Sequence, residues 1–456
     1  MSISYNALSG ALAAQAAINT VSQNVANLQT KGYTRQGVLL QSIASDPGLN
    51  SPGNGVQVGA LLRFSDSYKS QQMWRANSDL GQRSQVQPYL TQLEKVMADK
   101  TSSISYGVDN FFKALNAAAV DPTSTPLRQQ VITMADSMSQ QINSIYNLTA
   151  TQMVSVNQQR TTMLPSLNES LASIAALNKQ IIQVGAAGTS TSGLIDQREL
   201  LIDAVSAQVA VEVLNNPDGS ISVSLKTGQP LVVTDMAAKL SFDTVAGTQT
   251  LNLAFAGTTF KLDETKVGGQ LGGLGDFLEN TLKPLQVSIS EIAEQMSTMV
   301  NDQLNAGFTA PGVNGADLFV FNPTSATGLL GIDPAFKAAD LAFSSDGTPG
   351  NSGNLQVLID IKSQPIVLTS LGSVLLNDAD TQVVGKLAVD SQQNQSLLKT
   401  ATTIRQQSED DWKSTSAVNR DEEAINLIEY QNMYQANMKV ISVANSLFDA
   451  TLQMFN

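Results

Sequence analysis

The chain contains no cysteine and no histidine. Their absence excludes disulfides, thiolate nucleophiles, histidine-based catalytic triads and histidine- or thiolate-ligated metals. Aromatic residues make up 5% of the 456 positions and charged residues 14%. No stretch approaches the roughly 18 apolar residues of a membrane span, so no membrane partner is expected. The net charge is −13, and no cluster of lysine and arginine favours a nucleic-acid partner.

What remains is enough for several packed domains. Hydrophobic residues make up 42% of the chain, and its length predicts two to four domains. A polar but weakly charged surface suits a protein that packs many copies side by side. The first residues lack the cationic and continuous apolar regions of a cleaved signal peptide, which predicts either a cytosolic protein or export by another route.

The last segment, residues 421–455, carries a regular apolar pattern. Its positions alternate at spacings of three and four, which is typical of the a/d seam of a left-handed coiled coil. One heptad position holds Leu427, Tyr434, Ile441, Phe448 and Phe455, and the other holds Ala424, Gln431, Met438, Asn445 and Leu452. Asp421, Glu422 and Glu423 lie in the predicted first turn, where carboxylates favour the helix dipole.

The first thirty residues show a matching pattern. The same alternation covers Ala7, Ala11, Ala14, Ile18, Val21, Val25 and Leu28, and Leu8 and Leu12 broaden the stripe. Lys31 and Gly32 follow, a cation suited to a last helical turn and a glycine suited to a helix cap, and Tyr33 is expected to anchor the turn by packing. The chain is therefore expected to begin and end with apolar-seamed helices.

Two arrangements of these helices are open. They could pair with each other in a closed monomeric bundle, or associate with further copies. Burying each large apolar side chain contributes roughly 1.5–3 kcal/mol, while ordering the backbone costs roughly 1–2 kcal/mol per residue. One seam against one alanine-rich partner is marginal, so we expect ends that are mobile in the monomer and ordered in an assembly. The predicted assembly interface comprises Leu8, Leu12, Ile18, Val21, Val25, Leu28, Leu427, Tyr434, Met438, Ile441, Phe448, Leu452 and Phe455.

Between the ends, the apolar period indicates helices interrupted by one β-rich stretch. Helical periodicity covers most of 67–207, with Pro88 as a possible kink, Thr125 as a helix N-cap and Pro165 as an interruption. It returns at 274–304 and from 381 to about 416, while 305–350 read as loop-rich and 354–380 as a helix plus loop. From 208 to 266 the period changes to two, and Asn216–Pro217–Asp218–Gly219 separates two alternating runs as in a β-hairpin. Residues 33–62 read as a loop-rich connector with short strands.

The fold class that follows is mostly α with an inserted β domain, in a nested architecture. The terminal coiled-coil layer takes residues 1–32 and 418–456. A long-helix bundle with connector loops takes 33–207 and 267–417, and a small outer β domain takes 208–266. The glycines at 268–273 lack the Lys-Ser/Thr ending of a phosphate loop, and Arg198 beside Asp196 and Glu199 is more typical of an ion network than of catalysis. We therefore expect no cofactor.

Several stretches resemble one known family. They are Ser-Gln-Asn-Val-Ala-Asn at 22–27, Gly-Tyr-Thr-Arg-Gln at 32–36, Leu-Ile-Asp-Gln-Arg-Glu-Leu-Leu at 194–201, the glycine-rich entry at 268–280 with Leu-Asn-Ala-Gly-Phe at 304–308, and residues 419–437. The first is similar to the amino terminus of bacterial flagellar axial proteins in general. The others resemble the hook-associated members of that family, which form the hook–filament junction.

The resemblance implies a structural, non-enzymatic role and a set of partners. In the family the terminal helices form an inner layer around a central channel, a second helical layer surrounds it and a β domain faces outward. The implied partners are further copies in a ring-like helical turn, the hook protein, the second hook–filament junction protein, the type III export apparatus and a cytosolic chaperone on the C-terminal helix. The implied location is the extracellular flagellum, after a transient cytoplasmic stage.

Three other functions compete with this interpretation. Another axial protein, of the hook or distal rod, is disfavoured because those usually continue with Gly-Phe-Lys-like residues where this chain has Gly32, Tyr33, Thr34 and Arg35. A hydrolase would need two carboxylates facing each other across a cleft, and the sequence nominates no such pair. A secreted adhesin could use the β insertion without replacing a structural role.

Overall fold

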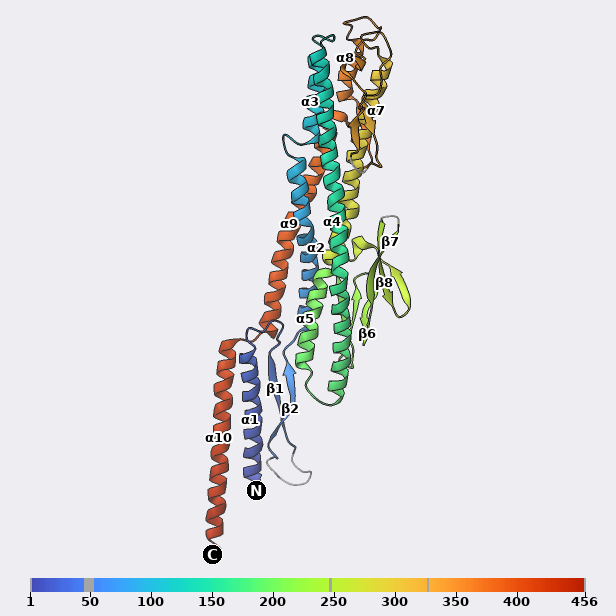
Figure 1. Ribbon diagram of the computed structural model, residues 1–456. Coiled ribbons are helices and arrows are strands. Elements are labelled where there is room, and N and C mark those ends of the chain that lie inside the picture. Colours follow the sequence, from blue (N-terminus) through green and yellow to red (C-terminus); the bar gives the residue numbers. More distant parts are fainter. Residues whose placement is uncertain (1, 45–52, 246–247, 326–327, 455–456) are drawn as a thin grey trace.

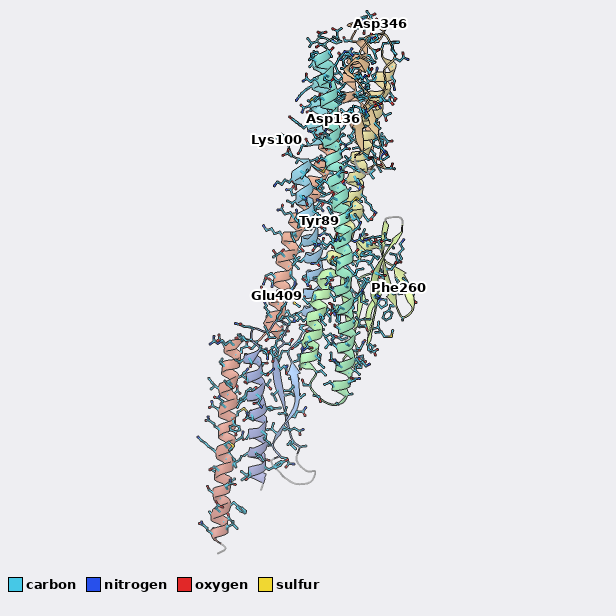
Figure 2. The ribbon with its side chains drawn as sticks, in the orientation of Figure 1. Tyr89, Lys100, Asp136, Phe260, Asp346 and Glu409 are labelled. Atoms are coloured by element: carbon cyan, nitrogen blue, oxygen red, sulfur yellow. The ribbon has the colours of Figure 1, made fainter. Side chains whose placement is uncertain are left out.

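The computed structural model describes residues 2–44, 53–245, 248–325 and 328–454. The molecule is a long rod with a separate helical pair at one end and β-sheets along one side (Figure 1). Side chains project from the whole length of the rod, and the packed interior runs along its axis (Figure 2). The predicted fold class, mostly α with a β insertion, is confirmed.

Both chain ends lie in the terminal unit, which we define as α1 (Ser2–Ala26), β1 (Gln36–Ser42), β2 (Val56–Arg63) and α10 (Arg420–Gln453). Helices α1 and α10 run side by side in opposite directions, and the antiparallel β1–β2 hairpin packs along α1 (Figure 1). The amide of Asn419 starts α10 by accepting from the backbone N–H groups of Asp421 and Glu422. The stretches Asp-Pro-Gly at 46–48 and Ser-Pro-Gly-Asn-Gly at 51–55 predict turns between the two strands, and of these only residues 53–55 lie within the described residues.

The rod is built from long helices, α2 (Ser67–Met97), α3 (Ile104–Ala118), α4 (Thr125–Ala186), α7 (Lys283–Ala306) and α9 (Leu376–Ser416). Pro88 and Pro165 lie inside α2 and α4 without splitting either helix. The 62 residues of α4 form one helix of about 93 Å at 1.5 Å per residue. This helix begins at Thr125 with Ser124 as its N-cap, so the predicted cap at Thr125 was one residue late.

The β-rich stretch forms two sheets rather than one. Strands β3 (Val211–Asn215), β4 (Ile221–Leu225), β5 (Pro230–Val233) and β6 (Met236–Ala237) make one sheet, in sequence order. Strands β7 (Lys239–Val245), β8 (Thr248–Phe255) and β9 (Thr258–Lys261) make the other. The inner faces of both sheets pack on α4 and α5 (Ser192–Gln208) in one apolar cluster that includes Leu171, Val223 and Leu253.

The upper end of the rod holds the second apolar cluster and several short elements. After η1 (Glu264–Lys266), α6 (Gly269–Phe277) and a π-helical turn (Leu278–Leu282) lead into α7. Beyond α7 lie strands β10 (Phe319–Phe321) and β11 (Leu330–Ile332), the 3-10 turn η3 (Ala338–Asp340), α8 (Gly353–Asp360), a second 3-10 turn, η4 (Ile361–Ser363), and strands β12 (Pro365–Leu368) and β13 (Gly372–Leu375). Residues 354–380, expected to be a helix plus loop, thus include the β12–β13 hairpin. None of the described helices is long and apolar enough to cross a membrane.

Candidate functional site on the terminal unit

The two terminal helices meet through small side chains. On α1 the buried residues are Ala7, Gly10, Ala11, Ala13, Ala14, Ala17 and Val21, together with Asn24 near its end. The approach is close, because a Cβ atom added to Gly10 would lie 2.7 Å from the amide oxygen of Asn437 on α10. The intramolecular pairing therefore uses the smallest residues of α1 and leaves most of its large apolar residues for other contacts.

The large apolar residues predicted on α1 mostly face solvent. Leu8 and Leu12 are exposed, Leu12 by 63%, and so are Val25 and Leu28. Ile18 is half-buried and Val21 is buried. The structure thus places Leu8, Leu12 and Val25 of α1, and Leu28 in the turn after it, on surfaces that the chain leaves largely uncovered.

Helix α10 turns one predicted heptad row toward α1. Leu427, Tyr434 and Ile441 of that row are half-buried there, whereas Phe448 is 63% exposed. The row continues past the start of α1, since Gly10 lies beside Asn437 and the last turns of α10 extend beyond the other helix (Figure 1). The next residue in this row, Phe455, lies outside the described residues.

The second heptad row needs a correction. Gln431, Met438, Asn445 and Leu452 are exposed, and the row one residue earlier, Tyr430, Asn437 and Ala444, packs toward α1 instead. The reason is size: the face of α1 is made of glycine and alanine, and Asn437 fits over Gly10. The larger Met438 and Leu452 remain available on the flank.

A further apolar stripe on α10 was missed by the sequence reasoning. Ile425, Val440, Val443 and Leu447 are exposed, the last two by 59% each. At 100° per residue, this stripe lies on the flank of α10 opposite to the one that carries Met438 and Leu452. The face roughly 180° from α1 is mostly polar, with Asn432, Gln435, Lys439 and Ser446, and its one large apolar residue among the described positions is Ile428, 60% exposed near the start of the helix. The spacing of Ala436, Val440, Val443 and Leu447 could have revealed the stripe.

Residues 27–35, which follow α1, lie between the terminal unit and the rod, and we call this segment the joint. Helix α1 ends at Ala26, so Gly32 does not cap it as predicted. Gly32 instead has a φ of +78° in a turn that the N–H of Tyr33 closes by donating to the carbonyl of Thr30 at 3.2 Å. The side chain of Tyr33 anchors the turn: its hydroxyl donates to Asn24 Oδ1 at 2.8 Å. Asn24 also bonds both backbone groups of Gln36.

Arg63 ties this joint to the rod. Its guanidinium binds Asp196 Oδ1 at 2.8 Å and Glu199 Oε2 at 2.7 Å on α5, and it donates to the hydroxyl of Thr34 at 2.8 Å. The N–H of Thr34 donates to the other oxygen of Asp196 at 3.2 Å. These side chains are largely buried, and burial opposes the charge of Arg63 while both carboxylates raise its pKa.

The predicted ion network around Arg198 is therefore arranged differently. Arg198 points away from Asp196 and Glu199 and donates to Asn178 Oδ1 at 2.8 Å and to the carbonyl of Gly219 at 2.9 Å. Among the described residues it makes no salt bridge within 4 Å, and burial lowers its pKa to about 10. It joins α5 to α4 and to the β3–β4 turn.

Arg35 connects the joint to the start of α10. The Arg35 N–H donates to the carbonyl of Ser416 at 2.8 Å, its guanidinium pairs with Glu422 and stacks 4.6 Å from the ring centre of Phe64. Glu423 is only 2% exposed, and burial raises the pKa of its carboxyl while Asn24 and Arg35 partly offset that rise. Sequence motifs from both ends and from α5 thus converge here.

The described residues contain no group of three or more acidic side chains placed to hold a metal ion. The ionisable groups of the joint are instead paired across chain segments. Because Arg35 and Arg63 bind carboxylates on α10 and α5, the arrangement can fix the orientation of the terminal unit.

Comparisons with known proteins agree with this architecture. Residues 90–319 match the model of the flagellar hook-associated protein FlgK helical domain, and residues 414–454 match that of the flagellar basal body rod FlgEFG protein C-terminal. The chain is 27% identical to flagellar hook-associated protein 1 of Salmonella typhimurium, over 98% of this chain and 99% of that protein. It is 25% identical to the protein of the same name from Bacillus subtilis, over 96% and 95%.

A solved structure is also similar. The flagellar hook junction protein FlgK from Burkholderia pseudomallei superposes with a TM-score of 0.51 at 27% identity. The match covers 55% of this chain and 47% of that chain, less than half of the solved protein's length. Since the helical-domain model spans half of the sequence, the chain belongs to the family of flagellar hook-associated proteins FlgK.

Proposed function

We propose that this chain is the structural adaptor that joins the hook to the filament of the bacterial flagellum, and that it polymerises through its terminal helices. The proposal rests on which side chains of those helices are buried within the chain and which are exposed. On α1, small residues make the intramolecular contact, while Leu12 and, on α10, Val443, Leu447 and Phe448 stay more than half exposed. Such a concentration of uncovered apolar side chains marks a surface that other protein covers.

The distribution around α10 supports a closed ring of copies. One side contacts α1, both flanks are apolar, and the side opposite α1 is polar from Asn432 onward, with Gln435 and Lys439, after Ile428 in the first turns. A helix with two apolar flanks is fully buried only when it has a neighbour on each side. Its polar side then faces water, as it would in a tube of helices around a channel.

The assembly interface that we propose includes the predicted residues and the additional stripe. The predicted members with the largest uncovered area are Leu8, Leu12, Met438, Phe448 and Leu452. Full burial of such a side chain contributes roughly 1.5–3 kcal/mol. Several of them on each subunit would order the ends of α1 and α10, where these helices have few other contacts.

The proposal also names the individual partners of the chain. An adaptor at this position would contact the hook protein on one side and the second hook–filament junction protein on the other. It would leave the cytoplasm through the type III export apparatus. A cytosolic chaperone would hold α10 before export, because Val443, Leu447 and Phe448 would otherwise promote aggregation.

A complementation experiment tests the proposal. In a strain that lacks the protein, we expect electron microscopy to show hooks without filaments and an immunoassay to detect flagellin in the medium. The double variant Val443→Asp with Leu447→Asp should behave like the deletion, whereas Ser446→Asp, on the polar side of the same helix, should restore filaments. Absent hooks would place the protein in the rod or hook, and normal filaments in the deletion strain would reject a required axial role.

A further inference from the structure

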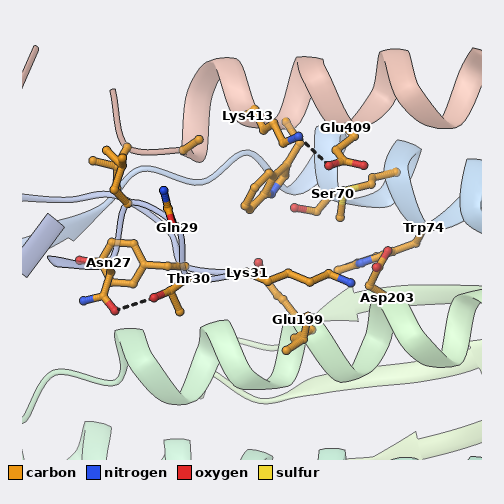
Figure 3. A pocket seen from close by; sticks show the side chains of 18 of the residues that line it. Asn27, Gln29, Thr30, Lys31, Ser70, Trp74, Glu199, Asp203, Glu409 and Lys413 are labelled. Carbon is orange, nitrogen blue, oxygen red and sulfur yellow. Dashed lines mark hydrogen bonds and ion pairs between the residues drawn. The ribbon is translucent and has the colours of Figure 1, made fainter. Parts of the chain in front are cut away.

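A cavity of about 440 Å³ lies beside the joint, between the terminal unit and the rod (Figure 3). The loop after α1, residues 27–33, forms one wall. The start of α2, the middle of α5 and the end of α9 form the others, with Trp74, Leu200 and Trp412 among the lining residues. The terminal unit is thus fixed on its Arg63 side and faces open space on this side.

Polar groups on the two walls face each other without contact. Lys31 extends from the loop into the cavity, toward Asp203 of α5 (Figure 3). It has no ion pair within 4 Å in the described part of the chain. Burial raises the pKa of Asp203, and the charges of Arg405 and then Lys31 oppose that rise; a hydrogen bond from Lys413 is the main cause that lowers the pKa of Glu409, to which Lys31 adds. Those carboxylates are shared between Arg405, at 3.4 Å from Asp203, and Lys413, at 2.7 Å from Glu409.

Two buried polar atoms of the rod wall lack hydrogen-bond partners. Ser70 Oγ and Trp74 Nε1 have no hydrogen-bond partner among the described residues, although Ser70 is 2% and Trp74 6% exposed. Buried polar groups are normally paired. The wall opposite carries the amide and hydroxyl side chains of Asn27, Gln29 and Thr30, which can accept from an indole N–H and bond a hydroxyl.

The connections across the joint permit movement. The chain passes between the terminal unit and the rod in two short non-helical segments, between β2 and α2 and at 417–419 between α9 and α10. The one cluster of charged side chains that we find clamping the terminal unit to α5, in the described residues, is Arg63 with Asp196 and Glu199. A rotation about that contact would bring residues 27–33 toward α9 and reduce the cavity.

We propose that the joint is a two-position hinge that pivots at Arg63 and Asp196, with Lys31 as the latch. In the open position, described here, water fills the cavity and Lys31 is unpaired. In the closed position the ammonium of Lys31 pairs with Asp203 and Glu409, and the polar side chains of the loop satisfy Ser70 and Trp74. The hinge goes beyond the junction role and belongs to the single chain.

The chain provides its own reporters for this movement. Trp74 and Trp412 are its only tryptophans, and both line the cavity. Closure should shift their emission to shorter wavelength and reduce quenching by acrylamide. Raising the salt concentration to 1 M, where the Debye length is about 3 Å, should weaken the latch and increase quenching. Lys31→Glu should show the high quenching already at low salt, whereas Lys100→Glu, the same charge change far from the joint, should behave as the wild type.

A distance measurement gives a second readout. Because the sequence has no cysteine, spin labels can be placed solely at Gln395→Cys on α9 and Ser442→Cys on α10. We expect two distance populations whose ratio shifts with salt and with Lys31→Glu, while circular dichroism shows unchanged helix content. A single distance population, with tryptophan quenching that responds neither to salt nor to Lys31→Glu, would overturn the hinge. Since both readouts use the free chain, their failure would leave the junction proposal untouched, and a failed complementation would leave the hinge untouched.

Discussion

The guanidinium of Arg63 lies 2.8 Å from Asp196 although 133 positions separate the two residues in the sequence. Arg63 ends β2 in the terminal unit, and Asp196 lies on α5 in the rod. Through Thr34 and Glu199 the same guanidinium also connects the loop after α1 to the rod. One side chain thus positions the terminal unit on the rod.

Removing that side chain should loosen the terminal unit. Arg63→Ala leaves the largely buried Asp196 and Glu199 without their cation, which we expect to cost about 3 kcal/mol in the free energy of unfolding. Urea unfolding followed by circular dichroism measures the cost, and hydrogen exchange should rise at Thr34. Arg75→Ala is the matched control, because its pair with Glu212 is exposed and 3.6 Å long, and should cost less than about 1 kcal/mol. Equal effects of the two variants would contradict the assigned role of Arg63.

The second buried pair allows a double-variant test. Arg160 on α4 pairs with Glu264, donates to Asn157 at 3.1 Å and stacks 4.7 Å from the ring centre of Phe242. Arg160→Met should destabilise the protein by roughly 3–5 kcal/mol, because the carboxylate stays behind with little solvent. Adding Glu264→Gln should recover most of the loss, since glutamine still accepts from the N–H of Leu251. If the double variant unfolds at the same urea concentration as Arg160→Met, the unpaired carboxylate is not the cause.

The raised pKa of Tyr33 predicts that the folded protein loses stability as the pH rises from about 10 to 12. Burial, followed by the negative charges of Asp196 and Glu423, raises the pKa of its phenol from 10.0 to about 12. Between these values the unfolded state loses the proton first, so stability is complete below about pH 10 and falls as the pH rises toward 12. Tyr33→Phe removes one hydrogen bond, worth about 1 kcal/mol at pH 8. The stability difference between wild type and variant should shrink from pH 10 to 12, and a constant difference would contradict the raised pKa.

The raised pKa of Glu423 predicts a pH dependence of the same sign as that of Tyr33, but in the acid range. Burial raises the pKa of its carboxyl, so the charged form is less stable in the folded protein than in the unfolded one. Glu423→Gln should therefore stabilise the protein at pH 7, and this advantage should vanish as acid protonates the wild-type carboxyl. The groups facing Glu423 are Asn24, Tyr33, Arg35 and Glu422. A destabilised variant at pH 7 would show that Arg35 depends on the charge of Glu423 as well as on Glu422.

Gly10 tests the close contact of the terminal helices. Gly10→Leu cannot fit over Asn437, so we expect α1 to separate from α10 and filaments to be lost in the complementation assay. Gly385→Ala is the control, because Gly385 lies inside α9 with no neighbouring atom within 4 Å of an added Cβ. That change should stabilise α9 by about 1 kcal/mol and leave filament formation intact. Normal filaments with Gly10→Leu would reject the contact.

The fold could be predicted from the sequence wherever periodicity was long. Helices α1, α4, α9 and α10 and the β3–β4 hairpin lie where their apolar spacing placed them. The β12–β13 hairpin was missed because its strands have four residues each, too few for a period of two to stand out between helices. Pro165 did not interrupt α4, since buried neighbours such as Leu164 and Leu167 hold the helix together across it.

The candidate site was less accessible to sequence reasoning. A heptad pattern ranks residues by hydrophobicity, and it therefore assigned Met438 rather than Asn437 to the seam. The structure selects by size instead, because Gly10 leaves room for a short side chain only. The convergence of Asn24, Arg63, Asp196 and Glu423 depends on how distant segments fold together, and no local spacing encodes it.

The nested arrangement also sets the order of folding. Helix α1 is the first described element and its partner α10 is the last. Arg35 can pair with Glu422, 387 positions later, only after the start of α10 has been made. A chain that emerges amino terminus first, from a ribosome or through a narrow conduit, can complete its rod while its first helix still lacks a partner. Completion of the terminal unit therefore requires that the chain has emerged as far as α10, so that a chain truncated before α10 cannot present a finished assembly surface.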